Sequence, residues 1–291
     1  MSASSLLVLK VGGDIATNPI LMTQVSKEIA VLKEFDFDVV LVHGGGPQLD
    51  QALKENGRQS RRIAGRRITS KKDLELAIQV WRGTLSVSWI KSLSHQGVMA
   101  CGICGADGLL LSGHRRPPKD VIDDNGSMVK VDFGYVGDLE DVNADLLHAL
   151  LASNIVPVIS PLAFDPVSGQ MLNVNADTVA AKVASALKSD CLIILASIPG
   201  LLLDVDDPMS KVSNLALKDV PDMIENGIIA GGMRPKMEAI GNALEEGVGR
   251  AIILDGRSRD IVNFLVYGIE VGTEISIEIK PQSEMASKTL V

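Results

Sequence analysis

Short runs that are apolar at nearly every position recur along this chain, and they constrain its fold more than any other feature. The runs consist mainly of valine, isoleucine and leucine, and they lie at residues 6–11, 39–43, 98–101, 155–160, 191–196 and 250–254. A continuous apolar run is typical of a strand buried on both faces of a sheet. Segments with helical periodicity separate the runs, at residues 22–35, 47–56, 72–96, 143–153, 177–187, 221–226 and 233–246. This alternation predicts an α/β protein, a three-layer αβα sandwich in which helices cover both faces of a central, mostly parallel sheet.

Residues 115–135 interrupt this alternation. Two prolines there are followed by Asp123, Asp124, Asn125 and Gly126, which stand between two short segments of strand-like composition. A turn-forming cluster in that setting predicts a β-hairpin inserted into the α/β core, where such hairpins often cover a site. The sequence shows no repeat or flexible linker, so we expect the boundary between an N-terminal lobe (1–175) and a C-terminal lobe (176–291) to fall inside the continuous sheet.

Charge and cysteine content exclude several classes of function. The 291 residues carry a formal net charge of -8, and the 28 lysines and arginines are scattered along the chain, which argues against nucleic acid or an anionic membrane as the main partner. The three cysteines are too few for a disulfide framework or a four-thiolate zinc site. The first apolar run follows no basic segment and is too short to span a membrane. We therefore expect a cytoplasmic protein with no nucleic-acid or membrane partner.

Two glycine loops follow the first two predicted strands. The first reads Lys10-Val11-Gly12-Gly13, and the second reads His43-Gly44-Gly45-Gly46-Pro47 and leads directly into a helix. Open α/β sheets bind ligands at the carboxyl ends of their strands, and glycine amides at a helix start favour phosphate. Two such loops predict a site for a polyphosphate or a transferring phosphoryl group, although a tight turn explains either glycine pair alone equally well. Neither loop matches Gly-x-Gly-x-x-Gly or ends in Gly-Lys-Ser/Thr, which excludes a standard dinucleotide fold and a Walker-type ATPase.

Two further helix starts carry side chains suited to anions. Asn173, Asn175 and Asp177 lead into one predicted helix, and Lys236 follows a Gly-Gly pair at the start of another. Asn175 and Asp177 are also ordinary helix-capping residues, so capping alone accounts for them as well as function does. A lysine in the first turn of a helix opposes the helix dipole, which makes Lys236 a candidate for binding an anion. Lys10, at the end of a buried strand, is a similar case.

Five motifs, in their order and spacing, resemble the amino-acid kinase family. They are Lys10-x-Gly-Gly13, His43-Gly-Gly-Gly-Pro47, Gly65-Arg-Arg-Ile-Thr69, Leu172-Asn-Val-Asn-Ala-Asp177 and Gly231-Gly-Met-x-x-Lys236. Within that family they are most similar to the enzymes of arginine biosynthesis that use ATP to phosphorylate the side-chain carboxylate of N-acetyl-L-glutamate. The resemblance implies the carbamate kinase-like fold, with acylglutamate binding and dimerisation in the N-terminal lobe and ATP binding in the C-terminal lobe.

The resemblance also implies roles for individual residues. Lys10 and Lys236 would act as catalytic charges on two sides of the phosphoryl group, and Asp177 would hold both in position and protonated. ATP and its phosphates would be bound by Lys10, Gly12, Gly13, Gly44, Gly45 and Lys236. The acylglutamate would be bound by Gly44, Gly45, Arg67, Asn173 and Asn175, with Arg67 on the α-carboxylate. The acceptor carboxylate needs no general base, and Mg²⁺ would arrive with ATP rather than occupy a metal site of the protein.

Several positions depart from the family pattern. Residues 196–200 read Ala-Ser-Ile-Pro-Gly, where the family usually places an aspartate near the nucleotide.

Three segments look like a subgroup that accepts N-succinylglutamate, at residues 105–108, 116–117 and 131–138. The second carboxylate of a succinyl group could meet Arg115, Arg116 or Lys119, unless these are solvated loop charges. The pattern also leaves open a carrier-linked aminoadipate as substrate and a sensor without catalytic activity on the same fold; the retained Lys-Asp-Lys set argues against the sensor.

Three smaller expectations concern packing and assembly. Cys101 and Cys104 form a lone Cys-x-x-Cys, which we expect to belong to the core. Trp81 and Trp89 stand eight residues apart on one predicted helix and mark either a dimer face or core packing. Only five residues precede the first strand, and the resemblance then implies a homodimer that arginine does not inhibit.

Overall fold

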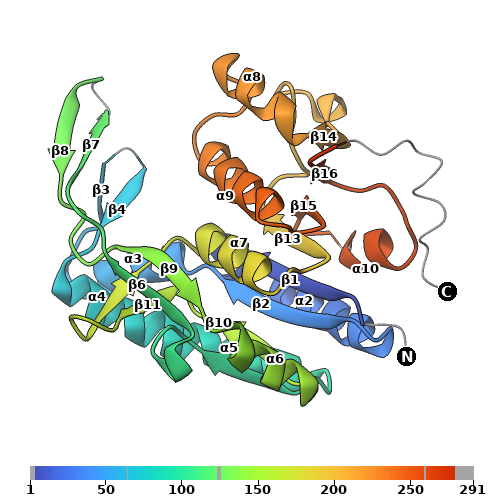
Figure 1. The fold of residues 1–291 in the computed structure, drawn as a ribbon, viewed down its shortest axis with the longest axis horizontal. Helices are drawn as coiled ribbons and strands as arrows, with labels where there is room; N and C mark the ends of the chain where they lie inside the picture. The colour runs from blue at the N-terminus through green and yellow to red at the C-terminus, as the bar shows by residue number, and fades with distance from the viewer. Residues whose placement is uncertain (1–3, 64, 123–125, 259, 279–291) are drawn as a thin grey trace.

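In the part of the chain that the structure describes, eight strands form the central sheet (Figure 1). The computed structural model describes residues 4–63, 65–122, 126–258 and 260–278. The strand order is β14-β16-β15-β13-β1-β2-β10-β5, and neighbouring strands are parallel except for β15 and β16. The strands span Leu6–Val11 (β1), Asp38–His43 (β2), Ala100–Ile103 (β5), Val156–Ile159 (β10), Cys191–Ala196 (β13), Asn214–Ala216 (β14), Arg250–Asp255 (β15) and Thr273–Ser276 (β16). The prediction of a mostly parallel central sheet is confirmed.

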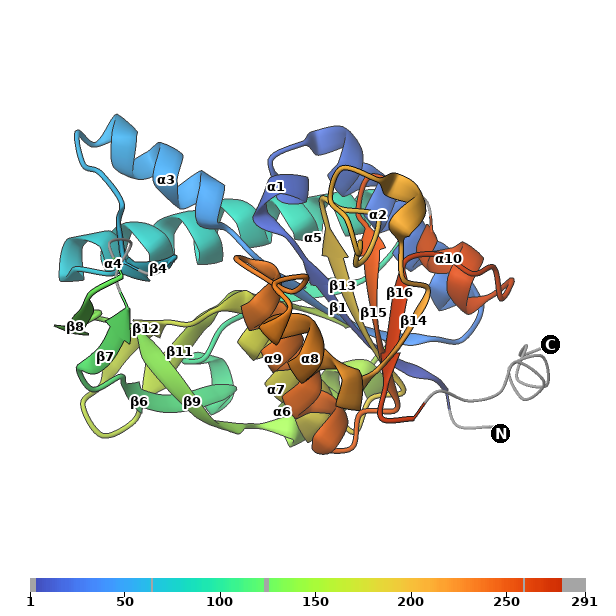
Figure 2. The ribbon, with the colours of Figure 1, turned by 90° about the horizontal axis from the view of Figure 1, so that it is seen from above.

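Helices cover both faces of this sheet and give the molecule three layers (Figure 2). Alternate residues of each strand enter two separate apolar cores, because successive side chains of a strand point to opposite faces. Val8 packs with α6, α7 and α9 on one face, whereas Leu7 and Leu9 pack with α2, α3, α5 and α10 on the other. The α-helices span Gly13–Ala16 (α1), Pro19–Glu34 (α2), Gly46–Glu55 (α3), Lys71–Ile78 (α4), Ser86–His95 (α5), Ala144–Ala152 (α6), Ala176–Ala186 (α7), Val220–Glu225 (α8), Met233–Glu245 (α9) and Asp260–Leu265 (α10). Short 3₁₀ turns lie at Asp107–Leu109 (η2), Pro208–Ser210 (η3) and Leu217–Asp219 (η4). The predicted αβα sandwich is confirmed, and no helix in the described ranges is long and apolar enough to cross a membrane.

The segment predicted as one helix over residues 72–96 consists of three pieces. Between α4 and α5 lies a π-helix, Gln79–Leu85 (η1), and the backbone stays helical at both junctions. Trp81 in η1 is 4% exposed and Trp89 in α5 is 0% exposed. Both tryptophans therefore pack in the core, and the interpretation of these tryptophans as a dimer face is wrong.

A smaller sheet and two hairpins lie together at one end of the molecule (Figure 1). The sheet has the order β12-β11-β6-β9 and spans Leu111–Arg115 (β6), Gly137–Val142 (β9), Leu162–Asp165 (β11) and Gln170–Asn173 (β12). The hairpins are Arg61–Ile63 (β3) with Arg66–Ile68 (β4), and Lys119–Ile122 (β7) with Met128–Val131 (β8). The hairpin predicted within residues 115–135 is confirmed as β7 and β8, and its predicted turn at 123–125 lies outside the described residues. The small sheet and the first hairpin are not indicated by the apolar pattern, because their short strands carry many polar residues.

The two halves of the chain supply the two halves of the central sheet. Strands β1, β2, β5 and β10 precede residue 175 and strands β13 to β16 follow it, and the halves meet where β1 pairs with β13. The register of β1 and β2 pairs Val11 with His43. The carboxyl ends of these two strands are therefore adjacent, which brings the two glycine loops together at one edge of the sheet.

Candidate active site

A cleft of about 870 Å³ opens at the carboxyl ends of β1 and β2. The glycine loops and the β3–β4 hairpin form one wall, and α7 and α9 form the other along most of their length. Most residues predicted for the site line this cleft, namely Lys10, Gly13, Gly44, Gly45, Arg67, Asn173, Asn175 and Asp177. Two predicted residues, Gly12 and Lys236, do not line the cleft, but Lys236 bonds to Asp177, which does.

Asp177 lies between two lysines that come from distant parts of the chain. Lys10 Nζ at the end of β1 is 2.8 Å from Asp177 Oδ1, and Lys236 Nζ in the first turn of α9 donates a hydrogen bond of 2.9 Å to Oδ2. The side chains of Lys10 and Asp177 are 7% and 8% exposed, whereas that of Lys236 is 21% exposed. One carboxylate between two ammonium groups leaves an excess of one positive charge in a poorly solvated place, which favours binding of an anion.

Burial and charge act against each other on this cluster. Burial lowers the pKa of Lys10 from its usual value, Asp177 opposes that shift, and Lys236 adds to it. Burial also acts to raise the pKa of Asp177, but the charges of Lys10 and Lys236 outweigh it and hold that pKa below its ordinary value. Asp177 is therefore ionised at neutral pH, and its effect on Lys10 has the direction expected of a residue that keeps the lysine protonated.

The two glycine loops approach each other too closely to carry side chains. A Cβ atom on Gly13 would lie 2.6 Å from Pro47 Cδ, and one on Gly44 would lie 3.0 Å from the Gly13 nitrogen. Gln48 ties the loops together, because its side-chain amide donates to the Gly13 carbonyl at 2.9 Å. Close packing of the loops therefore requires glycine here, whether or not a ligand is bound.

Two of the residues predicted to bind phosphate already use their amides within the protein. The Gly44 amide donates to the Val11 carbonyl at 2.8 Å, and the Gly12 amide donates to the Leu195 carbonyl at 3.2 Å. Both bonds extend the pairing of neighbouring strands past their ends. The predicted role of the Gly44 amide at phosphate therefore does not fit this geometry, and the amide of Gly12 is engaged in the same way.

Other amides of the loops remain open to the cleft. Among the described residues, no acceptor bonds to the backbone amides of Gly13, Gly45 or Gly46, and all three residues line the cleft. Gly46 is the first residue of α3, where the helix dipole adds to the attraction for an anion. The sequence prediction omits Gly46, although it stands in the same His-Gly-Gly-Gly-Pro motif and precedes the proline that marks a helix start.

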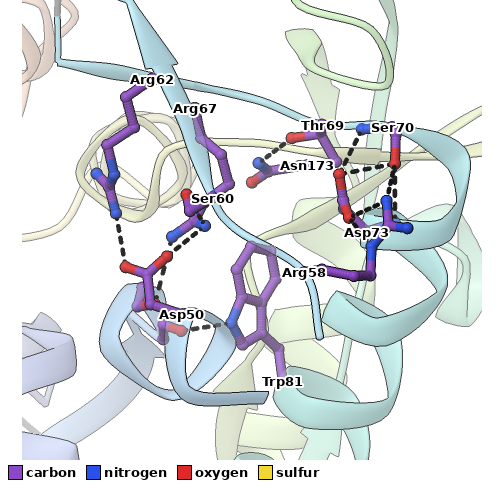
Figure 3. A network of polar contacts seen from close by, with 12 residues as sticks. Asp50, Arg58, Ser60, Arg62, Arg67, Thr69, Ser70, Asp73, Trp81 and Asn173 are labelled. Atoms are coloured by element: carbon purple, nitrogen blue, oxygen red, sulfur yellow. Dashed lines mark hydrogen bonds and ion pairs between the residues drawn. The ribbon is translucent and has the colours of Figure 1, made fainter. Parts of the chain in front are cut away.

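Arg67 reaches the cleft from β4 with its guanidinium fixed by the protein (Figure 3). Its Nη1 is 2.6 Å from Asp50 Oδ1 and also donates to the Ser60 hydroxyl, and its Nη2 donates to the Gly46 carbonyl at 3.3 Å. Arg62 contacts the other oxygen of Asp50 at 2.8 Å. Partial burial acts to raise the pKa of Asp50, but Arg67, Arg62 and Ser60 together outweigh that effect and lower it. A guanidinium has five N–H donors, so two remain for a ligand after these three contacts.

Asn173 and Asn175 sit where β12 leads into α7. Asn173 donates from Nδ2 to the Thr69 hydroxyl at 2.9 Å (Figure 3). Asn175 accepts with Oδ1 from the amides of Asp177 at 2.7 Å and Thr178 at 3.3 Å, so it caps α7. Capping thus accounts for the Asn175 oxygen but not for its amide group, and substrate binding by these two residues stays a prediction.

His43 is wholly buried beneath the second glycine loop. Its Nδ1 is 3.1 Å from the Gly44 carbonyl oxygen, and its Nε2 is 3.1 Å from Ser160 Oγ. Burial lowers the pKa of His43 to about 4. The imidazole is therefore neutral at physiological pH, and because the carbonyl can only accept, Nδ1 carries the proton.

We expect His43 to make the folded state less stable as the pH falls from about 6.5 to about 4. The unfolded chain, with a histidine pKa near 6.5, binds a proton in this window while the folded protein, with its pKa of about 4, does not. The loss amounts to about 3 kcal/mol. Urea unfolding at pH 7.5 and pH 4 measures it against His43→Asn, which lacks the titrating group. The stability difference between wild type and variant should shrink by that amount, and a constant difference would show that His43 titrates normally.

The residues of the cleft do not form a resident metal site. The described ranges contain no group of three or more His, Cys, Asp or Glu side chains placed to hold a metal ion. Asp177, the carboxylate beside the glycine loops, is engaged by two lysines. A divalent cation that enters with a nucleotide would be held mainly by phosphate oxygens and water.

Two further sequence features lie away from the cleft. In the unusual turn at residues 196–200, the Ser197 hydroxyl donates to Asp14 Oδ2 at 3.3 Å, and no residue of that turn lines the cleft.

Cys104 is buried, Cys101 is half-buried, and both are free thiols. The expectation that this cysteine pair belongs to the core is confirmed for Cys104.

The fold and its lysine-flanked cleft define an α/β phosphotransferase that positions its substrates with backbone amides and fixed charges. The chain belongs to the amino acid kinase family, which it matches over residues 5–255. It is 38% identical over 273 residues to the acetylglutamate kinase of Methanothrix thermoacetophila, covering 94% of this chain and 92% of that protein. It is also 38% identical over 279 residues to the acetylglutamate kinase of Psychrobacter arcticus, covering 96% and 90%. The family resemblance seen in the sequence is confirmed.

Solved structures confirm the fold. The smu.665 protein of Streptococcus mutans matches with a TM-score of 0.75 and 25% identity, covering 94% of this chain and 99% of that one. The N-acetylglutamate synthase of Neisseria gonorrhoeae, complexed with coenzyme A and N-acetyl-glutamate, has a TM-score of 0.77 and 23% identity, covering 95% of this chain and 60% of that one. The carbamate kinase of Giardia lamblia bound to AMP-PNP has a TM-score of 0.69 and 18% identity, covering 96% and 100%. At these identities, the last two show the fold alone.

Proposed function

We propose that this protein transfers the γ-phosphoryl group of ATP to the side-chain carboxylate of N-acetyl-L-glutamate, as a step of arginine biosynthesis. The observation that carries the proposal is the Lys10, Asp177 and Lys236 cluster beside the open amides of the glycine loops. The acetylglutamate kinases of Methanothrix thermoacetophila and Psychrobacter arcticus, as relatives of this chain, support the choice of substrate. A sensor without catalytic activity is disfavoured, because a binding protein has no need of charge aimed at a transferring group.

The proposed reaction needs placement and charge more than proton transfer. A glutamate side chain has a pKa near 4.3, so it is already an ionised nucleophile at neutral pH. The phosphoryl group passes between nucleophile and ADP, and its oxygens are stabilised by nearby cations and N–H donors. Lys10 and the amides of Gly13, Gly45 and Gly46 would meet these oxygens, and Lys236 would meet the charge that develops on the ADP side.

The arrangement of substrates and subunits forms part of the proposal. Residues 1–175 would bind the acylglutamate and form a homodimer, and residues 176–291 would bind ATP with its Mg²⁺. The meeting of the two sheet halves at β1 and β13, with cleft walls from both sides, supports this proposed division. Sedimentation velocity would test the dimer.

Release of ADP by the purified protein tests the proposed activity. The protein is incubated with ATP, Mg²⁺ and, in parallel, N-acetylglutamate, N-succinylglutamate or free glutamate, and the acyl phosphate is trapped with hydroxylamine. We expect ADP and hydroxamate in equal amounts with N-acetylglutamate and little turnover of free glutamate. No turnover with any of the three would contradict the proposal and favour a carrier-linked substrate or the sensor.

One observation favours N-succinylglutamate as a second candidate substrate. A side cavity of about 230 Å³ shares Arg66 and Arg116 with the main cleft and is also lined by Lys119 and Asp138. Arg116 pairs with Asp138 at 2.6 Å, while Arg66 forms no ion pair with the described residues. Arg115 is held at the surface by Asp132 at 2.7 Å and does not line either space. A second carboxylate on the acyl group would find an excess of positive charge in this side cavity.

Replacing Arg66 tests which acyl group the site takes. If the substrate is N-succinylglutamate, Arg66→Gln should raise its KM about tenfold, the effect expected for loss of one charged hydrogen bond, and leave the KM of N-acetylglutamate unchanged. Arg61→Gln is the matched control, because Arg61 lies on the adjacent strand and lines neither space. Equal KM values in wild type and Arg66→Gln would remove Arg66 from acyl recognition.

Arg67→Ala should raise the KM for the acylglutamate by about 10- to 100-fold and leave the KM for ATP within a factor of about three. The guanidinium is fixed by Asp50 and Ser60 with two N–H donors to spare, so its loss removes charged hydrogen bonds from one substrate only. Steady-state kinetics with each substrate varied in turn measures the effect. Arg58→Ala removes another arginine–aspartate pair, to Asp73 at 2.8 Å and outside the cleft, and serves as the control. A larger effect on ATP would mean that the two substrates bind in the opposite halves.

A further inference from the structure

We propose that Trp81, Ser160 and His43 form a positioning network that aims the amides of Gly45 and Gly46 at the transferring phosphoryl group. The inference rests on the proposed kinase function and adds residues to its machinery. None of the three side chains needs to touch substrate for this role, because they act on the backbone of the second glycine loop.

Trp81 contacts the second glycine loop at Gly45 and also lines the cleft. Its indole Nε1 donates a hydrogen bond of 2.7 Å to the Gly45 carbonyl, which also accepts from the Leu49 amide at 3.0 Å. The ring lies so close that a Cβ on Gly45 would be 2.3 Å from Trp81 Cδ1. The Gly45 peptide group is therefore fixed by both a directional bond and contact with the ring.

His43 holds the preceding peptide group. Its Nδ1–H donates to the Gly44 carbonyl at 3.1 Å, and its Nε2 faces Ser160 Oγ at 3.1 Å. The single hydroxyl proton of Ser160 faces two acceptors, His43 Nε2 and the Trp81 carbonyl at 3.3 Å. Ser160 thus joins the two side chains into one connected network, with exposures of 0% for His43 and Ser160 and 4% for Trp81.

Fixing these two carbonyls also fixes the two amides that follow them. A peptide group is planar and trans, so the C=O of one residue and the N–H of the next point in opposite directions. The bond to the Gly44 carbonyl therefore directs the Gly45 N–H, and the bond to the Gly45 carbonyl directs the Gly46 N–H. These are two of the amides that line the cleft and have no acceptor among the described residues.

The π-helix accounts for how Trp81 takes part. Trp81 is the third residue of η1, the seven-residue segment that interrupts an otherwise α-helical stretch. Such segments are rare and are frequently found at functional sites. Here the segment presents two groups of Trp81 to the site at once, its indole N–H to Gly45 and its backbone carbonyl to Ser160.

The network should affect turnover more than binding. Amides that are aimed in advance stabilise charge in the transition state without reorganising, and removal of one such donor typically lowers kcat by about 10²- to 10³-fold. Loss of an aligning bond leaves the amide present but free to tilt, so we expect about a 10- to 100-fold fall in kcat with little change in KM.

Trp81→Phe, compared with Trp89→Phe, tests the proposal in the full-length protein. Both tryptophans are buried on the same long helical segment, but the Trp89 indole N–H has no partner among the described residues. We expect Trp81→Phe to lower kcat about 10- to 100-fold with both KM values within about threefold, and Trp89→Phe to leave kcat unchanged. Similar melting temperatures for the two variants would separate positioning from stability. Equal kcat values in the two variants would overturn the proposal.

Two more measurements test the network in other ways. They apply if Trp81→Phe folds poorly or if the wild-type protein has no kinase activity. His43→Asn can still donate to the Gly44 carbonyl and should retain more turnover than His43→Leu; equal losses would count against the network. The ¹⁵N-glycine amide resonances of Gly45 and Gly46 should shift in Ser160→Ala and Trp81→Phe but not in Trp89→Phe, and this readout needs no activity. Wild-type protein without turnover would refute the proposed function, whereas unmoved resonances would refute the positioning network.

Discussion

Asp177→Asn is expected to reduce kcat by about 10³-fold or more. Each well-placed charge or donor at a transferring group contributes about 3 to 4 kcal/mol to the transition state, and in the proposed mechanism Asp177 positions two of them, Lys10 and Lys236, with which it forms ion pairs. Asparagine has the shape of aspartate without its charge, so the substitution leaves two ammonium groups close together with no counterion. The effect should fall on turnover rather than on the KM of the acylglutamate.

The same substitution should destabilise the fold and alter the ionisation of Lys10. Removing one partner of a buried ion pair typically costs about 3 to 5 kcal/mol, and both Lys10 and Asp177 are less than a tenth exposed. Burial and the charge of Lys236 already lower the pKa of Lys10, and only Asp177 opposes them. Without it, the pKa of Lys10 falls further, so the remaining activity should decline with rising pH at a lower pH than in the wild type.

Measurements of kcat between pH 6 and pH 9 and of the melting temperature would test both expectations. Asp38→Asn is the matched control, because Asp38 pairs with Lys33 at 3.1 Å on the outside of the molecule and is 28% exposed. That variant should keep its turnover and lose little stability. A kcat of Asp177→Asn within tenfold of the wild type would contradict the role of Asp177 in catalysis.

The sequence predicts those parts of the fold that depend on local pattern. The run at residues 6–11 is apolar throughout, apart from Lys10, and it becomes β1 with the same limits, because a strand buried on both faces leaves no room for alternation. The small sheet is different. Its strand β9 reads Gly-Asp-Leu-Glu-Asp-Val, and such a composition is stabilised by neighbouring strands rather than by its own pattern.

The hydrophobic periodicity of the sequence does not reveal the π-helix. One wider turn shifts the apolar face too little to break the helical pattern across residues 72–96, so Trp81 looks like an ordinary core position. Its bond to Gly45 depends on the approach of η1 to a loop far away in the sequence. The contacts that fix Arg67, to Asp50 and Ser60, are tertiary in the same way.

The glycine motifs also show that tertiary contacts are not predicted by local sequence. The sequence locates the loops correctly, but strand pairing decides which amides are free. Gly44 extends the β1–β2 pairing by bonding to Val11, whereas Gly45 and Gly46 turn away into the helix start. A motif therefore predicts where glycine loops come together better than it predicts which of their N–H groups remain free.

Lys236→Ala is expected to lower kcat by about 10²- to 10³-fold while the KM for the acylglutamate stays within about threefold. Lys236 is the more exposed lysine of the cluster and lies at the start of α9, on the side assigned to ATP. Its contact would strengthen only as negative charge moves to the ADP oxygen, so its loss appears in turnover. Steady-state kinetics measures this, with Lys33→Ala as a control that removes a lysine–aspartate pair outside the cleft. An unchanged kcat would remove Lys236 from the mechanism.

The Lys236→Ala and Asp177→Asn variants should differ in the stability of the folded protein. Loss of Lys236 removes a like charge that lowers the pKa of Lys10, and Lys10 keeps Asp177 as its partner, so the melting temperature should change little. If the two residues act as one unit, the double variant should be hardly slower than Asp177→Asn alone, because Lys236 has already lost its position there. Multiplicative losses in the double variant would instead mean that Lys236 reaches its place without Asp177, and that the ion pair between them serves the fold rather than the reaction.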